Sequence, residues 1–128
     1  MSQRLEAELA LVRTAFPDLE FLADGLWARV PAYPMPEGWG LEHAEIAFQF
    51  RRDSIAEEPY GFWVSPPLTL PGGGTPTNTS GPVATGFGNN FQQFSWAPDG
   101  WAPAVDLRCG TNMLNWVRSF RKRLAEIG

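Results

Sequence analysis

Apolar side chains recur at helical spacing near the start of the chain. Leu5, Leu9, Val12 and Phe16 are four, three and four residues apart and would form one stripe on a helix. This spacing predicts an amphipathic helix over residues 3–16. Proline cannot continue a helix, so the Pro-Asp pair at residues 17–18 predicts its end.

The same spacing returns near the end of the chain. Met113, Val117, Phe120 and Leu124 are again four, three and four residues apart, which predicts a second, C-terminal helix. Cys109 lies four residues before Met113, in phase with this stripe. We therefore expect the thiol of Cys109 to be buried and to act as a small apolar side chain.

A hairpin is predicted after the first helix. Residues 19–23 and 26–30 flank the dipeptide Asp24-Gly25, which is typical of a two-residue turn between antiparallel strands. The next segment, residues 31–40, contains three prolines. Proline cannot donate a hydrogen bond to a neighbouring strand, so this segment is predicted to be a structured loop.

Two further strands are predicted before the chain becomes irregular. Residues 44–51 alternate, with Ile46, Phe48 and Phe50 on one face, and residues 60–64 form a short fourth strand. Residues 65–90 are rich in Gly, Pro, Ser and Thr and show no periodicity. Long segments of this kind in a compact domain are usually functional or disordered.

The predicted fold class is α+β. An N-terminal helix, a four-stranded antiparallel meander, a long irregular active-site-type loop and a C-terminal helix follow one another, which favours helices packed on one face of the sheet. The 128 residues are enough for one domain, residues 1–128, and too few for two.

Composition excludes several classes of function. The net charge of −4 argues against a nucleic-acid partner, since such proteins usually present a basic face. No segment approaches the roughly 20 apolar residues of a membrane span, and the N-terminus lacks the apolar core of a signal peptide, so we expect a cytoplasmic protein without a membrane partner. One cysteine, one histidine and scattered carboxylates predict neither a disulfide nor a metal site. We expect no cofactor.

One basic cluster stands near the C-terminus, at Arg118, Arg121, Lys122 and Arg123. Cations near the end of a helix complement its dipole and remain solvated. A docking patch for an acidic partner is the alternative interpretation.

Three segments carry a family resemblance. They are "EEPYGFWVSPPL" (residues 57–68), "FQQFSW" (residues 91–96) and "WAPAVDLRCGTNMLNWVRSFRKRL" (residues 101–124). In this order, after a helix and a meander, they resemble the proline-rich segment, the end of the active-site loop and the Trp-Ser-Pro segment with its helix in the ubiquitin-conjugating enzyme superfamily. The form Trp/Phe-Gln-x-Phe-Ser is similar to a bacterial branch, prokaryotic family E. The resemblance covers about residues 3–124.

The resemblance implies a function and two partners. A member of this family receives a ubiquitin-like protein from an activating enzyme and passes it on, with the N-terminal helix as the docking face for the activating enzyme. By resemblance, residues 86–101 would form the active site, and the protein would belong to a bacterial ubiquitin-like modification pathway.

The sequence departs from the family where the chemistry lies. No cysteine precedes Trp101 in the position of the usual nucleophile, and the His-Pro-Asn motif is absent. Asn89 and Asn90 stand near the corresponding place without the histidine and proline. Ser95 is followed by Trp96 and Ala97, so the histidine expected after this serine is missing as well.

Ser95 is the candidate nucleophile, because its hydroxyl could hold the partner's C-terminus as an oxyester. A serine hydroxyl needs a general base, and the nearest carboxylate in the sequence is Asp99. Asn89 or Asn90 could donate hydrogen bonds to an oxyanion. The alternative is an ordinary loop hydroxyl that bonds within a turn.

Phe94, Trp96 and Trp101 are the candidate binding residues around Ser95. We expect Trp96 to be the exposed tryptophan, while Trp101 anchors the loop against the last helix. A Cys–His pair of Cys109 with His43 would require the fold to bring two distant segments together.

The sequence leaves three functions open, and with them the question of whether the chain is an enzyme. The first is a conjugating-enzyme-like transferase that uses Ser95. The second is a catalytically inactive adaptor that binds the ubiquitin-like protein or the activating enzyme. The third is an unrelated peptide- or sugar-binding module that uses its aromatic side chains.

Overall fold

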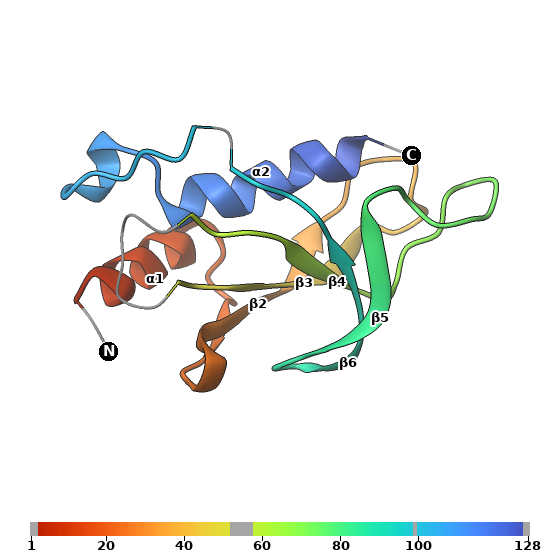
Figure 1. The fold of residues 1–128 in the computed structure, drawn as a ribbon, viewed down its shortest axis with the longest axis horizontal. Helices are drawn as coiled ribbons and strands as arrows, with labels where there is room; N and C mark the ends of the chain where they lie inside the picture. Colours follow the sequence, from red (N-terminus) through yellow and green to blue (C-terminus); the bar gives the residue numbers. More distant parts are fainter. Residues whose placement is uncertain (1–2, 52–57, 99, 127–128) are drawn as a thin grey trace.

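A computed structural model of the chain describes residues 3–51, 58–98 and 100–126. Two helices enclose a run of strands along the chain (Figure 1). The helices are α1 (Gln3–Ala15) and α2 (Met113–Ala125), with two short 3-10 turns, η1 (Asp24–Leu26) and η2 (Leu107–Cys109). The strands are β1 (Glu20–Leu22), β2 (Trp27–Pro34), β3 (His43–Gln49), β4 (Phe62–Ser65), β5 (Thr79–Thr85) and β6 (Gly88–Phe94). Within the described residues, neither helix is long and apolar enough to cross a membrane.

The strands form one antiparallel sheet in the order β1-β2-β3-β4-β6-β5. The first four pair in chain order, which confirms the predicted meander. The irregular loop predicted over residues 65–90 is wrong for its second half, which contains β5 and the start of β6. The two strands contain Gly, Pro and Asn, which are depleted in strands, and apolar and polar residues do not alternate clearly along them.

The hairpin between β1 and β2 is confirmed, and its turn is longer than predicted. Leu22 pairs with Trp27, so the turn spans residues 23–26 and includes η1, with Gly25 at a φ of 79°. Glycine adopts this left-handed conformation readily because it lacks a Cβ.

The structured loop predicted over residues 31–40 is wrong for its first four residues. β2 continues to Pro34, although the register with β3 shifts between Val30 and Tyr33. β1 pairs only with Trp27–Arg29, so beyond Arg29 this side of β2 has no neighbouring strand in the sheet. Proline is tolerated on such a free edge and beside an irregularity in the register.

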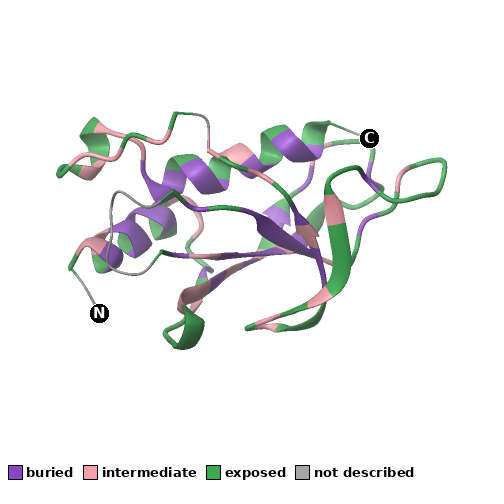
Figure 2. Cartoon of the chain, viewed as in Figure 1, coloured by how far each residue is buried: buried purple, intermediate pink, exposed green. Residues whose placement is uncertain are grey.

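The main core lies between the sheet and the two helices, which cover the same face (Figures 1 and 2). Phe62 of β4 stacks on Phe94 of β6 at 5.1 Å between ring centroids and on Phe120 of α2 at 4.3 Å. The apolar stripes predicted for both helices are buried here, except that Phe16 is only half-buried. The α+β fold, with both helices on one face of an antiparallel sheet, is therefore confirmed.

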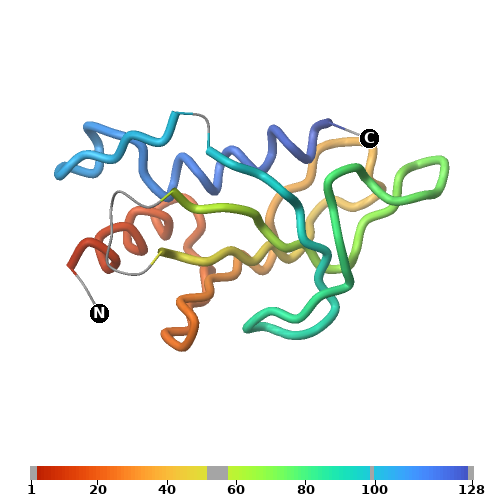
Figure 3. Tube along the Cα trace, viewed as in Figure 1, coloured from red at the N-terminus to blue at the C-terminus, as the bar shows by residue number. Residues whose placement is uncertain are grey.

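The other face of the sheet carries a smaller aromatic cluster. Trp63 and Phe91 are buried in it, and Trp27 lies edge-on to Trp63 at 4.8 Å between ring centroids. The tip of the β5–β6 hairpin lies on the side of the sheet away from the helices (Figure 3). Gly86 at this tip lies so close to the Trp27 indole that an added Cβ would be 2.6 Å from it.

Candidate functional site

Ser95 directly follows β6, an inner strand of the sheet. Its backbone N–H donates to the carbonyl of Asn78 at 2.9 Å, and the next carbonyl, that of Trp96, accepts from Gly61 N–H at 2.8 Å. The Ser95 residue is exposed, and its hydroxyl has no hydrogen bond among the described residues. The backbone is therefore held on both sides while the hydroxyl faces solvent.

The single active-site loop predicted over residues 86–101 is wrong in its first half. Residues 88–94 form β6, which lies inside the sheet between β4 and β5. Phe94 is completely buried and stacks on Phe62. A partner cannot reach this side chain, so the binding role expected for Phe94 is wrong, and its role is in packing.

Asn89 and Asn90 are exposed at the turn end of β6, whereas Ser95 follows the opposite end. A strand rises roughly 3.3 Å per residue, so five or six residues separate these side chains from Ser95 by roughly 17–20 Å. The structure does not bring the candidate oxyanion donors to the candidate nucleophile.

The one histidine is also far from Ser95. The register joins Ala47 of β3 to Trp63 of β4, and Trp63 to Gln93 of β6. β3 and β6 therefore run in the same direction, and His43 and Ser95 lie six positions apart along it, roughly 20 Å. Asp99 lies outside the described residues. Among those that the structure describes, no side chain is bonded to Ser95 as a base.

Trp96 is half-buried, not the exposed tryptophan that the sequence predicts. Its indole Nε1–H donates to the hydroxyl of Ser119 on α2 at 3.0 Å, and that hydroxyl donates to the carbonyl of Trp116 at 2.6 Å. The side chain packs against the main core. Trp96 therefore fastens the segment after β6 to α2, which leaves only part of its ring for a partner.

Trp101 is half-buried and packs against the main core, while the residue after it is tied to the segment just before α2. Ala102 N–H donates to the hydroxyl of Thr111 at 3.1 Å, and Thr111 N–H donates to the carbonyl of Ala102 at 3.0 Å. The indole Nε1 of Trp101 is buried without a hydrogen-bond partner among the described residues. Its place fits the anchoring role predicted for it.

Cys109 is exposed, so the predicted burial is wrong. It lies in η2, and α2 begins only after the cap at Asn112, so the phase of the helical stripe does not extend to it. The loop before His43 lies at the other end of α2, where Trp39 Nε1–H donates to the carbonyl of Leu124 at 2.7 Å. A helix of 13 residues is roughly 20 Å long, so the structure does not form a Cys109–His43 pair.

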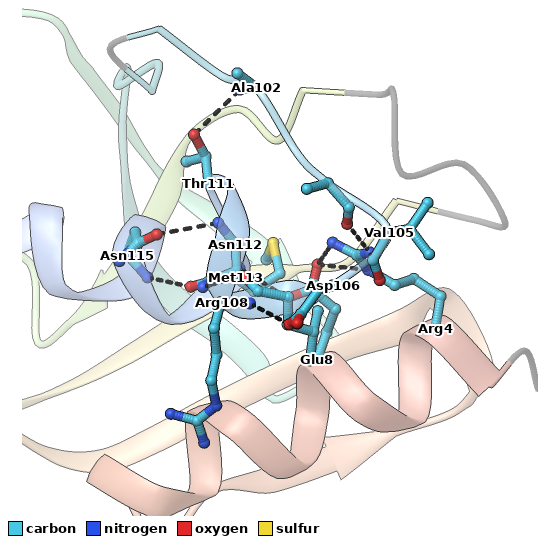
Figure 4. Close-up of polar contacts among 12 residues, drawn as sticks. Arg4, Glu8, Ala102, Val105, Asp106, Arg108, Thr111, Asn112, Met113 and Asn115 are labelled. Carbon is cyan, nitrogen blue, oxygen red and sulfur yellow. Dashed lines mark hydrogen bonds and ion pairs between the residues drawn. The ribbon is translucent and has the colours of Figure 1, made fainter.

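Two residues of α1 hold the segment before α2, a contact that sequence analysis missed (Figure 4). The Arg4 guanidinium donates to the carbonyls of Ala104 and Val105 and forms an ion pair with Glu8 at 3.3 Å. Glu8 is buried and accepts the first helical N–H of α2, from Met113, at 3.0 Å. The i,i+4 spacing of Arg4 and Glu8 could have predicted their ion pair. It could not have predicted their contacts with the segment before α2, which are about a hundred residues away in sequence.

The start of α2 is capped a second time by its own residues (Figure 4). The Asn112 side chain accepts from Asn115 N–H at 2.9 Å, and the Asn115 side chain accepts from Asn112 N–H at 3.1 Å. Such a reciprocal box satisfies backbone donors that have no partner within the helix. With Glu8 it fixes where α2 begins.

Two further kinds of site were possible: a surface hollow and a cluster of metal-ligating side chains. A hollow of about 200 Å³ lies between the end of α1 and β2, and Asp18 is the only ionisable residue among the described ones that line it. Within the described part of the chain, no three His, Cys, Asp or Glu side chains gather in a way that could hold a metal ion. Neither feature includes Ser95.

Comparisons with protein-family models, with curated proteins and with solved structures found no match to this chain.

Proposed function

We propose that this chain is a ubiquitin-conjugating-enzyme-like adaptor of a bacterial ubiquitin-like modification pathway. It binds a ubiquitin-like protein or its activating enzyme and does not carry the ubiquitin-like protein covalently. The order of helix, antiparallel meander and C-terminal helix supports the family assignment. So does the Trp-Ala-Pro segment at Trp101, which leads into the last helix as the Trp-Ser-Pro segment of the family does.

The observation that carries the adaptor function is the surroundings of Ser95. A serine hydroxyl attacks a carbonyl only when a base accepts its proton, and an oxyanion donor lowers the barrier further. Among the described residues, Ser95 has no base, and Asn89 and Asn90 lie at the far end of β6. Ser95 is thus exposed on an ordered backbone that a partner could contact, but the described residues supply neither the base nor the oxyanion donor that transfer of a ubiquitin-like protein requires.

A conjugating enzyme that works through Ser95 is the second candidate. It is favoured by the exposure of Ser95 and by the backbone hydrogen bonds that hold residues 95 and 96 to Asn78 and Gly61. A fixed, accessible hydroxyl is the arrangement that an oxyester would need. Under this function a base would have to come from a partner or from Asp99.

Binding experiments with a matched pair of serine variants test the adaptor function. Ser95→Ala and the control Ser80→Ala each remove one exposed hydroxyl, and residue 80 pairs with Gln93 on the neighbouring strand. Isothermal titration calorimetry with the ubiquitin-like and activating-enzyme-like proteins of the same organism should give one Kd for both variants and the unmodified chain. If none of the three proteins binds either partner, the proposed function is wrong.

A further inference from the structure

The outer face of α2 carries positive charge that no acidic residue of the helix balances. Residues 113–125 contain no Asp or Glu, although the whole chain has a net charge of −4. Of the cations in this stretch, Arg123 is buried and turned inward, where it donates to the carbonyl of Thr77 at 2.7 Å and lies over the Phe94 ring at 5.1 Å. Arg118, Arg121 and Lys122 are exposed.

These three side chains differ from the paired arginines of the same molecule. Arg4 forms an ion pair with Glu8, and Arg29 forms ion pairs with Glu20 and Glu45. Among the described residues, Arg118, Arg121 and Lys122 have no ion pair. We call these three the α2 basic face.

The stability of the helix does not account for the α2 basic face. Arg118 is three residues before Arg121 and four before Lys122, and like charges at these spacings on a helix repel one another. The helix dipole favours cations only in the last turn. That covers Lys122, but Arg118 lies seven residues before Ala125, about two turns away.

The chemistry of the α2 basic face selects the kind of partner. Arginine guanidinium groups bind carboxylates through two parallel hydrogen bonds, and lysine adds a point charge. The three residues lie within about one turn of one helix, which suits a short acidic segment. A nucleic acid would normally contact more cations than these three.

We propose that the α2 basic face, formed by Arg118, Arg121 and Lys122, binds an acidic segment of a partner protein. The Trp96 indole, bonded to Ser119 on the same helix, borders this face with a half-buried ring. The inference goes beyond the proposed function, because it follows from the charges of α2 and does not depend on a ubiquitin-like partner.

Fluorescence anisotropy with a labelled oligoglutamate peptide tests this proposal on the full chain. The Arg118→Glu/Lys122→Glu variant should bind the peptide roughly tenfold more weakly than the unmodified chain. The control, Arg51→Glu/Arg108→Glu, makes the same change in net charge at two exposed arginines outside the α2 basic face and should bind as the unmodified chain does. Circular dichroism should give the same folded spectrum for all three proteins.

Three outcomes would overturn the proposal. One is that the unmodified chain does not bind oligoglutamate even at about 0.01 M salt, where charges act over about 30 Å. Another is that the control loses as much affinity as the α2 variant, which would make the effect one of net charge. The third is that oligothymidylate of the same charge binds more tightly than oligoglutamate, which would assign the face to nucleic acid.

Discussion

At the scale of single residues, two buried polar groups tie distant parts of the chain together. Glu8 of α1 accepts a hydrogen bond from the start of α2, and Tyr33 of β2 donates from its hydroxyl to the carbonyl of Val117 in α2 at 2.7 Å. Neither contact could be predicted from the sequence, because the partners lie more than eighty residues away. The sequence pattern predicted only the burial of the apolar residues on the same elements.

Glu8→Ala should destabilise the fold by about 2–4 kcal/mol. The change leaves the Arg4 guanidinium without its carboxylate and the first N–H of α2 without an acceptor, in a site from which water is largely excluded. Glu6→Ala removes an exposed carboxylate from the same helix and should change stability by less than about 0.5 kcal/mol. Urea denaturation measures both, and equal losses would show that the contacts of Glu8 contribute little.

Tyr33 should make the fold sensitive to high pH. Burial raises the pKa of Tyr33 from 10.0 to about 12, against the opposing effect of Arg121. Between these two values the folded chain keeps the phenol proton that the unfolded chain has lost. Stability is therefore fully present below pH 10 and falls by about 1.4 kcal/mol per pH unit as the pH rises towards 12.

Tyr33→Phe separates this effect from other groups that titrate at high pH. Near neutral pH the variant should lose about 1 kcal/mol with the hydrogen bond to Val117. Above pH 10 its stability should fall less steeply than that of the unmodified chain. Denaturation curves at several pH values measure both slopes, and parallel slopes would contradict the role given to Tyr33.

At the scale of elements, the helices were predictable and the second hairpin was not. Helical spacing of apolar residues is visible in a single sequence. It predicts α1 from Leu5, Leu9 and Val12, and α2 from Met113 and Phe120. β5 and β6 form from Gly, Thr, Pro, Asn and Gln, and few of their side chains are buried. β6 pairs with β4 and β5 pairs with β6, although neither strand shows a clear alternation of apolar and polar residues.

Gly86 tests how the tip of this hairpin lies on the sheet. A methyl group there would be 2.6 Å from the Trp27 ring, so Gly86→Ala must move the tip or the indole and should cost about 1–3 kcal/mol. Gly72→Ala is the control, since an added Cβ at residue 72 meets nothing within 4 Å. Thermal denaturation with tryptophan fluorescence should show a loss for residue 86 only. A Gly86→Ala variant as stable as the control would mean that the tip does not rest on Trp27.

At the scale of the whole molecule, the arrangement of the sheet decides which candidate residues meet. The sequence predicted the α+β class and the meander, since both depend on local patterns. It did not predict that residues 88–94 would become a strand, and that strand separates Asn89 and Asn90 from Ser95. The same sheet keeps His43 about six positions from Ser95 along the strands. The candidate site therefore consists of an exposed serine beside a tryptophan bonded to α2.

The most direct test of the adaptor function is intact-mass spectrometry. The chain is incubated with ATP and with the ubiquitin-like and activating-enzyme-like proteins of the same organism, then separated by size exclusion and weighed. We predict that the chain elutes with a partner while its own mass stays unchanged. A mass gain of one ubiquitin-like protein, removed by hydroxylamine and absent from Ser95→Ala, would contradict the account and identify a serine-based conjugating enzyme.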